Sequence, residues 1–432
     1  MRRQSQGHNR LGIALAIGFI LLLGSCTSKG GATKGSDTGT APLTVAVFNP
    51  FSGPDASFGS EQSAGCITAT SAITSAGGIL NHKQIVVKTS DTRGDPADAV
   101  PAAQQLISST PNLVQVCGPS SDEASATVPL LDKANIPMFA DTGQAFFDKS
   151  NYQYFHRITP PDDAVGYAMA LYAWDHGYKT AAAVFGNDIS SQGTAPTVMA
   201  GFKNLGGKIV LSQTLALDQS SYRTEVEQLA AAHPDVIFTE ADPQTSATYI
   251  AELNQLYHLV PIVGDNGTNQ PPWIKAVTGA IGASNLNKYF VAAQPYAPAT
   301  GASYDQWLRA VKAAQSKLTQ PGSQWFADTY SMAAYDGVNI SALAMEEAKS
   351  TDPTVFNPFI LRVVSPSPGA VQVHSFAEGK QALLAGKTIQ YVGAIGQIAF
   401  DQYNNSPGLF EIVKADRSKV AVYTAAQVDT AK

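Results

Sequence analysis

Near the start of the folded region, apolar runs, turns and a small-residue segment follow one another in a regular order. An apolar run at 43–48 leads into the turn at 49–54, a small-residue segment at 59–76, the Gly77–Gly78 pair and a second apolar run at 85–89. A strand, a helix and a strand in this order predict a βαβ unit. We expect its two strands to be parallel and buried on both faces, because both runs are continuous rather than alternating.

The same alternation continues along the chain. The pattern predicts strands at 112–116, 136–140, 180–185, 208–211, 236–239, 261–264, 409–413 and 420–424. It predicts helices at 96–108, 122–134, 164–176, 193–205, 222–232, 245–257, 330–348 and 376–384. Two successive runs of β/α alternation indicate two similar α/β lobes rather than one large sheet.

The N-terminus has the pattern of an export signal. Arginines at positions 2, 3 and 10 precede an apolar run at 11–23, which is too short to span a bilayer comfortably. The run ends in Leu-Gly-Ser-Cys26, which resembles a bacterial lipoprotein processing site. We therefore expect residues 1–25 to be a signal peptide and Cys26 to carry lipid, the alternative being an ordinary signal peptide with a chance cysteine. Residues 26–42 have almost no apolar side chains and predict a flexible tether.

Two further cysteines, Cys66 and Cys117, lie in a predicted helix and at the end of a predicted strand. In an oxidising compartment they either form a disulfide or are two separate small core residues. The sequence leaves both alternatives open.

Charge and motifs exclude several classes of function. The formal net charge is −6 without a basic stripe, so nucleic acid is not an expected partner. The chain has no Gly-x-Ser-x-Gly elbow, phosphate-binding Gly-x-x-x-x-Gly-Lys loop or His-Glu-x-x-His motif, and its histidines are scattered. We therefore expect a binding protein rather than an enzyme, with no cofactor and no metal site.

Several motifs, found in order along the chain, carry a resemblance to a known family. They include Pro50-Phe-Ser-Gly-Pro54, Phe58-Gly59, Ala76-Gly-Gly-Ile79, Asp95-Pro96, Phe155-His-Arg-Ile-Thr159, Tyr330 to Asp336, and Tyr391-Val-Gly-Ala394. The chain resembles the branched-chain amino acid-type (Leu/Ile/Val-binding-like) substrate-binding lipoproteins of ABC transporters, which have the type I periplasmic binding protein fold. The resemblance implies two Rossmann-like lobes with parallel-rich sheets, joined by three hinge crossovers. It assigns residues 43–158 and 292–396 to the N-terminal lobe, and 159–291 and 397–432 to the C-terminal lobe.

The resemblance also implies a ligand site between the lobes, at the carboxyl ends of the strands. In the first lobe it points to Phe58, Ser120, Ser121, Thr142 and Gly143, with Ser121 donating to a ligand carboxylate and Phe58 lining the wall. Hydroxyls and backbone N–H groups at a helix start are suited to an anion. The alternative for Ser120 or Ser121 is that it caps the helix, and for Phe58 that it is a core residue.

In the second lobe the resemblance points to Ser190, Asp242, Asp265 and Asn266. Here the chain departs from the family pattern, because Ser190 or Ser191 replaces an aromatic residue, Asp242 a tyrosine, and Asn266 a glutamate. With Asp188, these acids predict a cleft that favours a cationic or strongly hydrogen-bonding ligand. The alternative for each acid is a solvated loop residue or helix cap.

The function that the resemblance implies is capture of an amino acid or similar small polar molecule for the permease subunits of an ABC importer. The expected location is the outer side of the cell membrane, held there by the lipid anchor. The alternative is a lipoprotein that reports its ligand to a membrane receptor. The same fold serves either role, so the sequence leaves both open.

Overall fold

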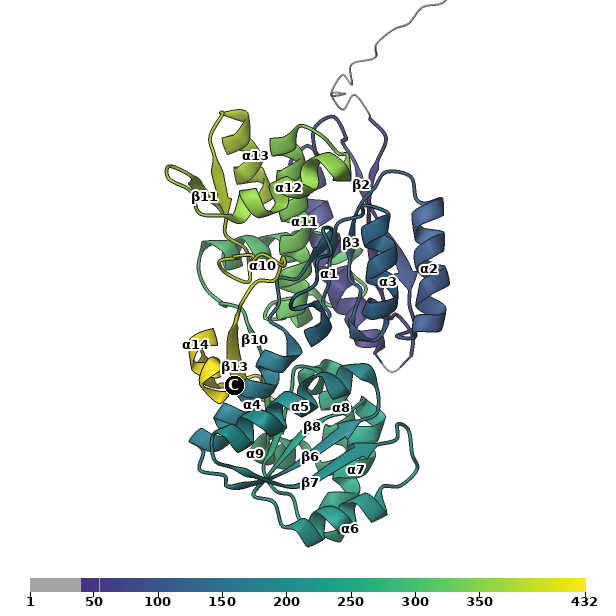
Figure 1. The fold of residues 1–432 in the computed structure, drawn as a ribbon. Coiled ribbons are helices and arrows are strands. Elements are labelled where there is room, and N and C mark those ends of the chain that lie inside the picture. The colour runs from purple at the N-terminus through teal and green to yellow at the C-terminus, as the bar shows by residue number, and fades with distance from the viewer. Residues whose placement is uncertain (1–39, 54) are drawn as a thin grey trace, which may run out of the picture. The chain divides into compact units, whose positions relative to one another are not determined.

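The computed structural model describes residues 40–53 and 55–432, all of which fall within one unit of the chain. These residues form two parallel-rich sheets, each covered by helices on both faces (Figure 1). The two-lobed α/β class expected from the sequence is confirmed. The predicted signal peptide, the lipidated Cys26 and the tether up to residue 39 lie outside the described residues.

The first lobe has a five-stranded sheet in the order β2-β1-β3-β4-β5, with every neighbouring pair parallel. Its strands are β1 (Leu43–Asn49), β2 (Ile85–Asp91), β3 (Leu113–Cys117), β4 (Met138–Phe139) and β5 (Phe155–His156). The predicted βαβ unit is present, and β1 is buried throughout. The expectation that both strands are buried is wrong for β2, because β2 is an edge strand whose residues are exposed or partly buried.

Helices cover both faces of this sheet (Figure 1). One core forms beneath α2 (Pro96–Ser109) and α3 (Ser121–Lys133). The opposite face packs against α1 (Ala56–Ser75), α10 (Ala302–Ala314), α11 (Thr329–Ala348), α12 (Pro353–Val364) and α13 (Phe376–Leu384). A short parallel pair, β11 (Val371–Val373) and β12 (Ile389–Tyr391), lies beside α13. Residues far apart in sequence therefore complete the first lobe.

The second lobe has a seven-stranded sheet in the order β14-β13-β10-β9-β8-β6-β7. Its strands are β6 (Thr180–Gly186), β7 (Lys208–Leu215), β8 (Val236–Glu240), β9 (Ile262–Gly264), β10 (Phe290–Tyr296), β13 (Leu409–Lys414) and β14 (Lys419–Tyr423). β13 is antiparallel to both β10 and β14, and the other pairs are parallel. The predicted pairing of the C-terminal segment into the second lobe is confirmed.

The second sheet also has a core on each face. One face packs against α4 (Asp162–Asp175), α5 (Ile189–Asn204) and α14 (Ala425–Val428). The other packs against α6 (Arg223–Ala232), α7 (Pro243–Leu256), α8 (Pro271–Ile281) and α9 (Ala283–Tyr289). Short 3₁₀ turns are η1 (Ala145–Phe147), η2 (Gly267–Asn269), η3 (Gln315–Lys317), η4 (Gly322–Trp325) and η5 (Asp429–Ala431).

Three segments of the described chain connect the lobes, at 157–161, 297–301 and 392–408. The first and third are joined, because the Arg157 N–H donates to the Asn404 carbonyl at 3.0 Å and the Ser406 N–H to the Arg157 carbonyl at 2.9 Å. The second crossing follows Tyr296, since all of β10 belongs to the second sheet. It therefore lies later than the boundary expected between residues 291 and 292.

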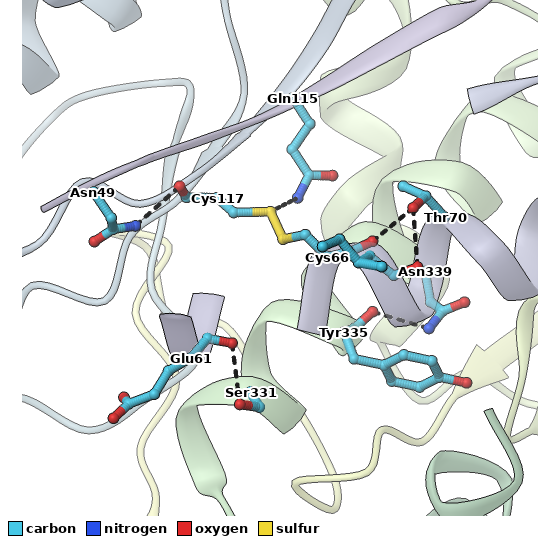
Figure 2. The surroundings of a disulfide bond; sticks show 10 residues. Asn49, Glu61, Cys66, Thr70, Gln115, Cys117, Ser331, Tyr335 and Asn339 are labelled. Carbon is cyan, nitrogen blue, oxygen red and sulfur yellow. Dashed lines mark hydrogen bonds between the residues drawn. A yellow bond between two sulfur atoms is a disulfide. The ribbon is translucent and has the colours of Figure 1, made fainter. Parts of the chain in front are cut away.

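A disulfide between Cys66 and Cys117 ties α1 to β3, which settles the alternatives left open for these cysteines (Figure 2). Both cysteines are fully buried in the first lobe. The Asn49 side-chain amide donates to the Cys117 carbonyl at 3.2 Å, and the Ser331 hydroxyl of α11 donates to the Glu61 carbonyl of α1 at 3.0 Å. The disulfide and the Ser331 bond fix α1, whose N-terminal end leads into the candidate site.

Candidate functional site

The first-lobe residues expected to bind ligand come together at the carboxyl ends of β3 and β4. The Ser121 and Thr142 hydroxyls lie 3.3 Å apart, and the Gly143 N–H donates to the Ser121 hydroxyl at 3.3 Å. The Gln144 side-chain amide donates to the Ser121 carbonyl at 2.9 Å. Ser121, Thr142 and Gly143 thus form one polar cluster, which we call the hydroxyl cluster. Its assembly follows from the rule that adjacent parallel strands end at the same sheet edge.

Ser120 acts as the cap of α3. Its N–H and its hydroxyl both donate to the Glu123 carboxylate, at 3.1 Å and 2.9 Å respectively, and the Thr92 hydroxyl donates to the same carboxylate at 3.0 Å. Burial raises the pKa of Glu123 to about 7, although these hydrogen bonds act to lower it. The Ser120 hydroxyl is therefore committed to the Glu123 side chain.

A cavity of about 30 Å³ lies where α1 of the first lobe meets the strand ends of the second lobe. We call it the inter-lobe cavity. Its lining residues are Asp55, Ser57, Phe58, Asp188, Ser191, Glu240, Ala241, Asp242, Pro243, Gly267, Gln270, Pro272 and Trp273. Phe58 and Asp242, two of the residues predicted to bind ligand, are among them. Ser191 and Gly267 line it in place of their expected neighbours Ser190 and Asn266.

The remaining second-lobe predictions surround this cavity. Asp242 caps α7 by accepting from the backbone N–H groups of Gln244 and Thr245, at 2.9 and 3.1 Å. Asp265 is buried and accepts from the Thr194 hydroxyl at 3.1 Å and from the Gly267 N–H at 3.0 Å. Asn266 immediately precedes η2.

Ser190 contributes its backbone rather than its hydroxyl. Its N–H donates to the Asp122 carboxylate of α3 at 3.1 Å, so α5 of the second lobe contacts the start of α3 in the first.

Two carboxyl–carboxyl pairs flank the cavity, one from each lobe. The Asp55 carboxyl lies next to that of Asp122, and the Glu240 carboxyl lies next to that of Asp265. Burial, with the Asp122 hydrogen bond and the charges of Asp122 and Asp188, raises the pKa of Asp55 to about 9. Burial and the neighbouring Asp265 likewise raise the pKa of Glu240 well above its usual range, while the pKa of Asp265 rises to about 6. Each pair therefore favours holding a proton, because ionising both members of a buried pair of neighbouring carboxyls is unfavourable.

A second group of acids lies around Tyr330, at the start of α11. Burial and the charges of Asp162, Glu61, Asp141 and Asp265 raise the pKa of the Tyr330 hydroxyl well above its usual range. Burial also raises the pKa of Asp141 to about 8 and that of Asp162 to about 7. Packing is tight here, because a Cβ added at Gly143 would collide with the Asp162 carboxylate. Acids of both lobes are thus concentrated at this interface.

Several of these residues were not predicted as ligand residues from the sequence. The sequence did contain a signal for two of them. Asp55 follows the turn after β1, and Glu240 is the last residue of β8. Gln270 and Trp273 were missed because α8 was not predicted. Among the described residues, no group of three or more His, Cys, Asp or Glu side chains is arranged to hold a metal ion.

A family model described as periplasmic binding protein matches residues 42–408, which is most of the chain. The chain belongs to this family. This assignment agrees with the two α/β lobes, the three crossovers and the polar inter-lobe cavity. Periplasmic binding proteins act outside the cytoplasm. Among residues 40–53 and 55–432 of this binding protein, no helix is both long and apolar enough to cross a membrane.

Curated relatives of this binding protein match over part of their length. It is 40% identical over 67 residues to "Leu/Ile/Val-binding protein homolog 3" of Brucella melitensis, an alignment that spans 18% of that protein. It is 27% identical over 204 residues to "Amino acid binding protein" of Pseudomonas aeruginosa, spanning 53% of that protein. The matched region thus falls short of two thirds of either relative.

Solved structures match the fold over nearly their whole length. One is a branched-chain amino acid transporter substrate-binding protein from Streptococcus pneumoniae in complex with isoleucine. Its TM-score is 0.70 at 18% identity, over 89% of this chain and 99% of that one. Another is an ABC transporter solute-binding protein from R. palustris in complex with 4-hydroxybenzoate, with a TM-score of 0.67 at 16% identity, over 89% and 97% of the two chains. These likenesses confirm the type I periplasmic binding fold.

Proposed function

We propose that this periplasmic binding protein is the extracytoplasmic receptor of an ABC importer and captures a small polar solute between its lobes. The observation that carries the proposal is that the start of α1 in the first lobe and the strand ends of the second sheet meet at one polar cavity. Asp55 and Phe58 reach it from the first lobe, and Asp188, Glu240 and Asp242 from the second. A ligand in contact with both lobes favours the closed arrangement, because it binds that state more tightly than the open one.

The role requires binding and release without turnover. In the closed state the two lobes would present a joint surface to the permease subunits. Lipid on Cys26 would hold the receptor at the outer side of the membrane. The relatives whose printed names refer to amino acids, and the solved proteins with isoleucine or 4-hydroxybenzoate, define the first set of solutes to test.

Titration calorimetry with amino acids and small aromatic acids tests this role. We expect one ligand to bind at one site per chain. Asp242→Ala or Gln270→Ala should each weaken it by about 1–3 kcal/mol, the scale for leaving a buried polar partner unpaired, because both residues line the cavity. Asp352→Ala is a matched control, because Asp352, like Asp242, precedes a proline and caps a helix, accepting from the Thr354 N–H at 2.9 Å. Unchanged affinity in both site variants, or equal loss in the control, would contradict the proposed site.

A further inference from the structure

The inter-lobe cavity offers mainly hydrogen-bond acceptors. Among the described residues that line it, the buried side-chain atoms without a hydrogen-bond partner are Asp188 Oδ2, Asp242 Oδ2, Gln270 Oε1 and Trp273 Nε1. Three of these atoms accept and only the indole nitrogen donates. Gln270 is 7% exposed, so its amide oxygen is removed from bulk water and needs a partner in the cavity. A ligand that satisfies these atoms must donate more hydrogen bonds than it accepts.

The charge of the cavity also favours a ligand that donates hydrogen bonds. Four of its lining residues are carboxylic acids, Asp55, Asp188, Glu240 and Asp242, and none of its described lining residues is lysine or arginine. The paired acids Asp122 and Asp265 lie directly behind two of them. Bringing the lobes together therefore brings acids of one lobe towards acids of the other. That approach is unfavourable without a counter-charge or bound protons.

The start of α3, which lies nearby, does not offer a comparable binding position for an anionic group of a ligand. The Ser120 N–H and hydroxyl are taken by the Glu123 carboxylate. The Asp122 carboxylate faces the second lobe and accepts from the Ser190 N–H. The Gly143 N–H is used by the Ser121 hydroxyl. The helix end that would attract an anion thus already has two carboxylates of the protein beside it.

We propose that the solute of the inter-lobe cavity is an organic cation, an amine or guanidine that bears no carboxylate. This inference rests on the proposed receptor function and specifies its ligand class. The cationic group binds between Asp55 of the first lobe and Asp188, Glu240 and Asp242 of the second, and donates to Gln270 Oε1. Because it takes the place of the protons held by acids of both lobes, it stabilises the closed arrangement.

Matched pairs of compounds that differ only in a carboxylate give the sharpest test. Calorimetry would compare 3-methylbutylamine with L-leucine, and agmatine with L-arginine, with 4-hydroxybenzoate as an anion. We expect at least one amine to bind about 10-fold or more tightly than its amino acid, and 4-hydroxybenzoate not to bind. Tighter binding of an amino acid or of 4-hydroxybenzoate overturns the cation assignment and leaves the receptor function standing. Absence of binding by the whole panel to folded protein contradicts both proposals.

Variants then locate the cation. Glu240→Gln and Asp55→Asn each replace, on opposite sides of the cavity, an acid that can ionise beside the cation with an amide that cannot, and each should weaken the bound amine by about 10-fold or more. Glu227→Gln, on the exposed surface of α6, is the control and should leave the affinity unchanged. Using two variants guards against a folding defect in either one, which circular dichroism would detect. Full affinity for the amine in both folded variants overturns the assignment.

Discussion

The Asp122 carboxylate of α3 accepts a hydrogen bond from the backbone N–H of Ser190, at 3.1 Å. Asp122 belongs to the first lobe and Ser190 lies in the first turn of α5 in the second, so this bond joins the two lobes beside the ligand cavity. Asp122 is also paired with Asp55, which lines that cavity. Asp122, which contacts the opposite lobe, therefore lies next to Asp55, which is expected to contact the ligand.

Removing the Asp122 acceptor should weaken ligand binding by disfavouring closure. We expect Asp122→Ala to reduce affinity by about 10–100-fold, because a hydrogen bond to a charged acceptor contributes about 1.5–3 kcal/mol. Asp122→Asn removes the charge but retains an oxygen that accepts from Ser190, so its loss should be smaller. Calorimetry on both variants measures the difference. Equal affinities would mean that the Ser190 bond does not couple the lobes.

The stability of the ligand-free protein should fall as the pH rises from about 4 to about 9. In the folded state the pKa values of Asp55, Asp141 and Asp162 are raised to about 9, 8 and 7 from an ordinary value of 3.8. A raised folded pKa contributes stability below the unfolded pKa and loses it as the pH rises through the folded pKa. Thermal unfolding at several pH values measures the trend.

Asp55→Asn provides the control for this pH dependence. The groups that act on Asp55 are Asp122, Asp188 and Glu123, all of them acidic. Because the asparagine side chain of this variant does not ionise, the variant should gain stability relative to the wild type as the pH rises from about 5 to about 9. A constant difference between the two proteins across that range would contradict a raised pKa at Asp55.

Loss of the Cys66–Cys117 disulfide should destabilise the first lobe. The cysteines are 51 residues apart, and a cross-link over a loop of that length contributes about 4 kcal/mol in the chain-entropy model. Urea unfolding of the Cys66→Ala/Cys117→Ala protein measures the loss. Reductant should then lower the stability of the wild type but not of the variant. A variant as stable as the oxidised wild type would show that the cross-link contributes little.

Asp336 should be essential for stability and not for ligand choice. It is fully buried in α11 and accepts from the Tyr391 hydroxyl at 2.7 Å and from the Ala394 and Ile395 N–H groups at 2.9 and 3.0 Å. Asp336→Ala should cost about 3 kcal/mol, because three donors lose their partner, whereas Tyr391→Phe should cost about 1–2 kcal/mol. Chemical unfolding compares them. A changed order of ligand affinities in the folded Tyr391→Phe protein would contradict a purely structural role.

Much of the fold could be predicted from local pattern. The β1-α1-β2 unit, the two runs of β/α alternation and the C-terminal strands β13 and β14 all correspond to predicted segments. The edge position of β2 could not be predicted, because a continuous apolar run does not reveal how many neighbouring strands a strand has. The helix α12 was not predicted either. It carries Pro358 in its interior, and a proline normally ends a helix.

The candidate site could also be predicted in part from the sequence. Strand-end reasoning brings together Ser121, Thr142 and Gly143, and it places Asp242 at the cavity. It does not reveal that Asp55 pairs with Asp122 or Glu240 with Asp265, because these pairs form only once distant segments pack. Nor does it reveal that buried Tyr330 lies among acids of both lobes. Tertiary contacts thus decide the charge of the site.

A crystal structure of the protein with its tightest ligand tests the account most directly. A ligand bound outside the inter-lobe cavity would contradict the account, and one such place is the separate cavity beside Arg157 and Asp401 at the crossovers. We predict instead a ligand in the inter-lobe cavity, with a positively charged group contacting Asp55 on one side and Glu240 or Asp242 on the other.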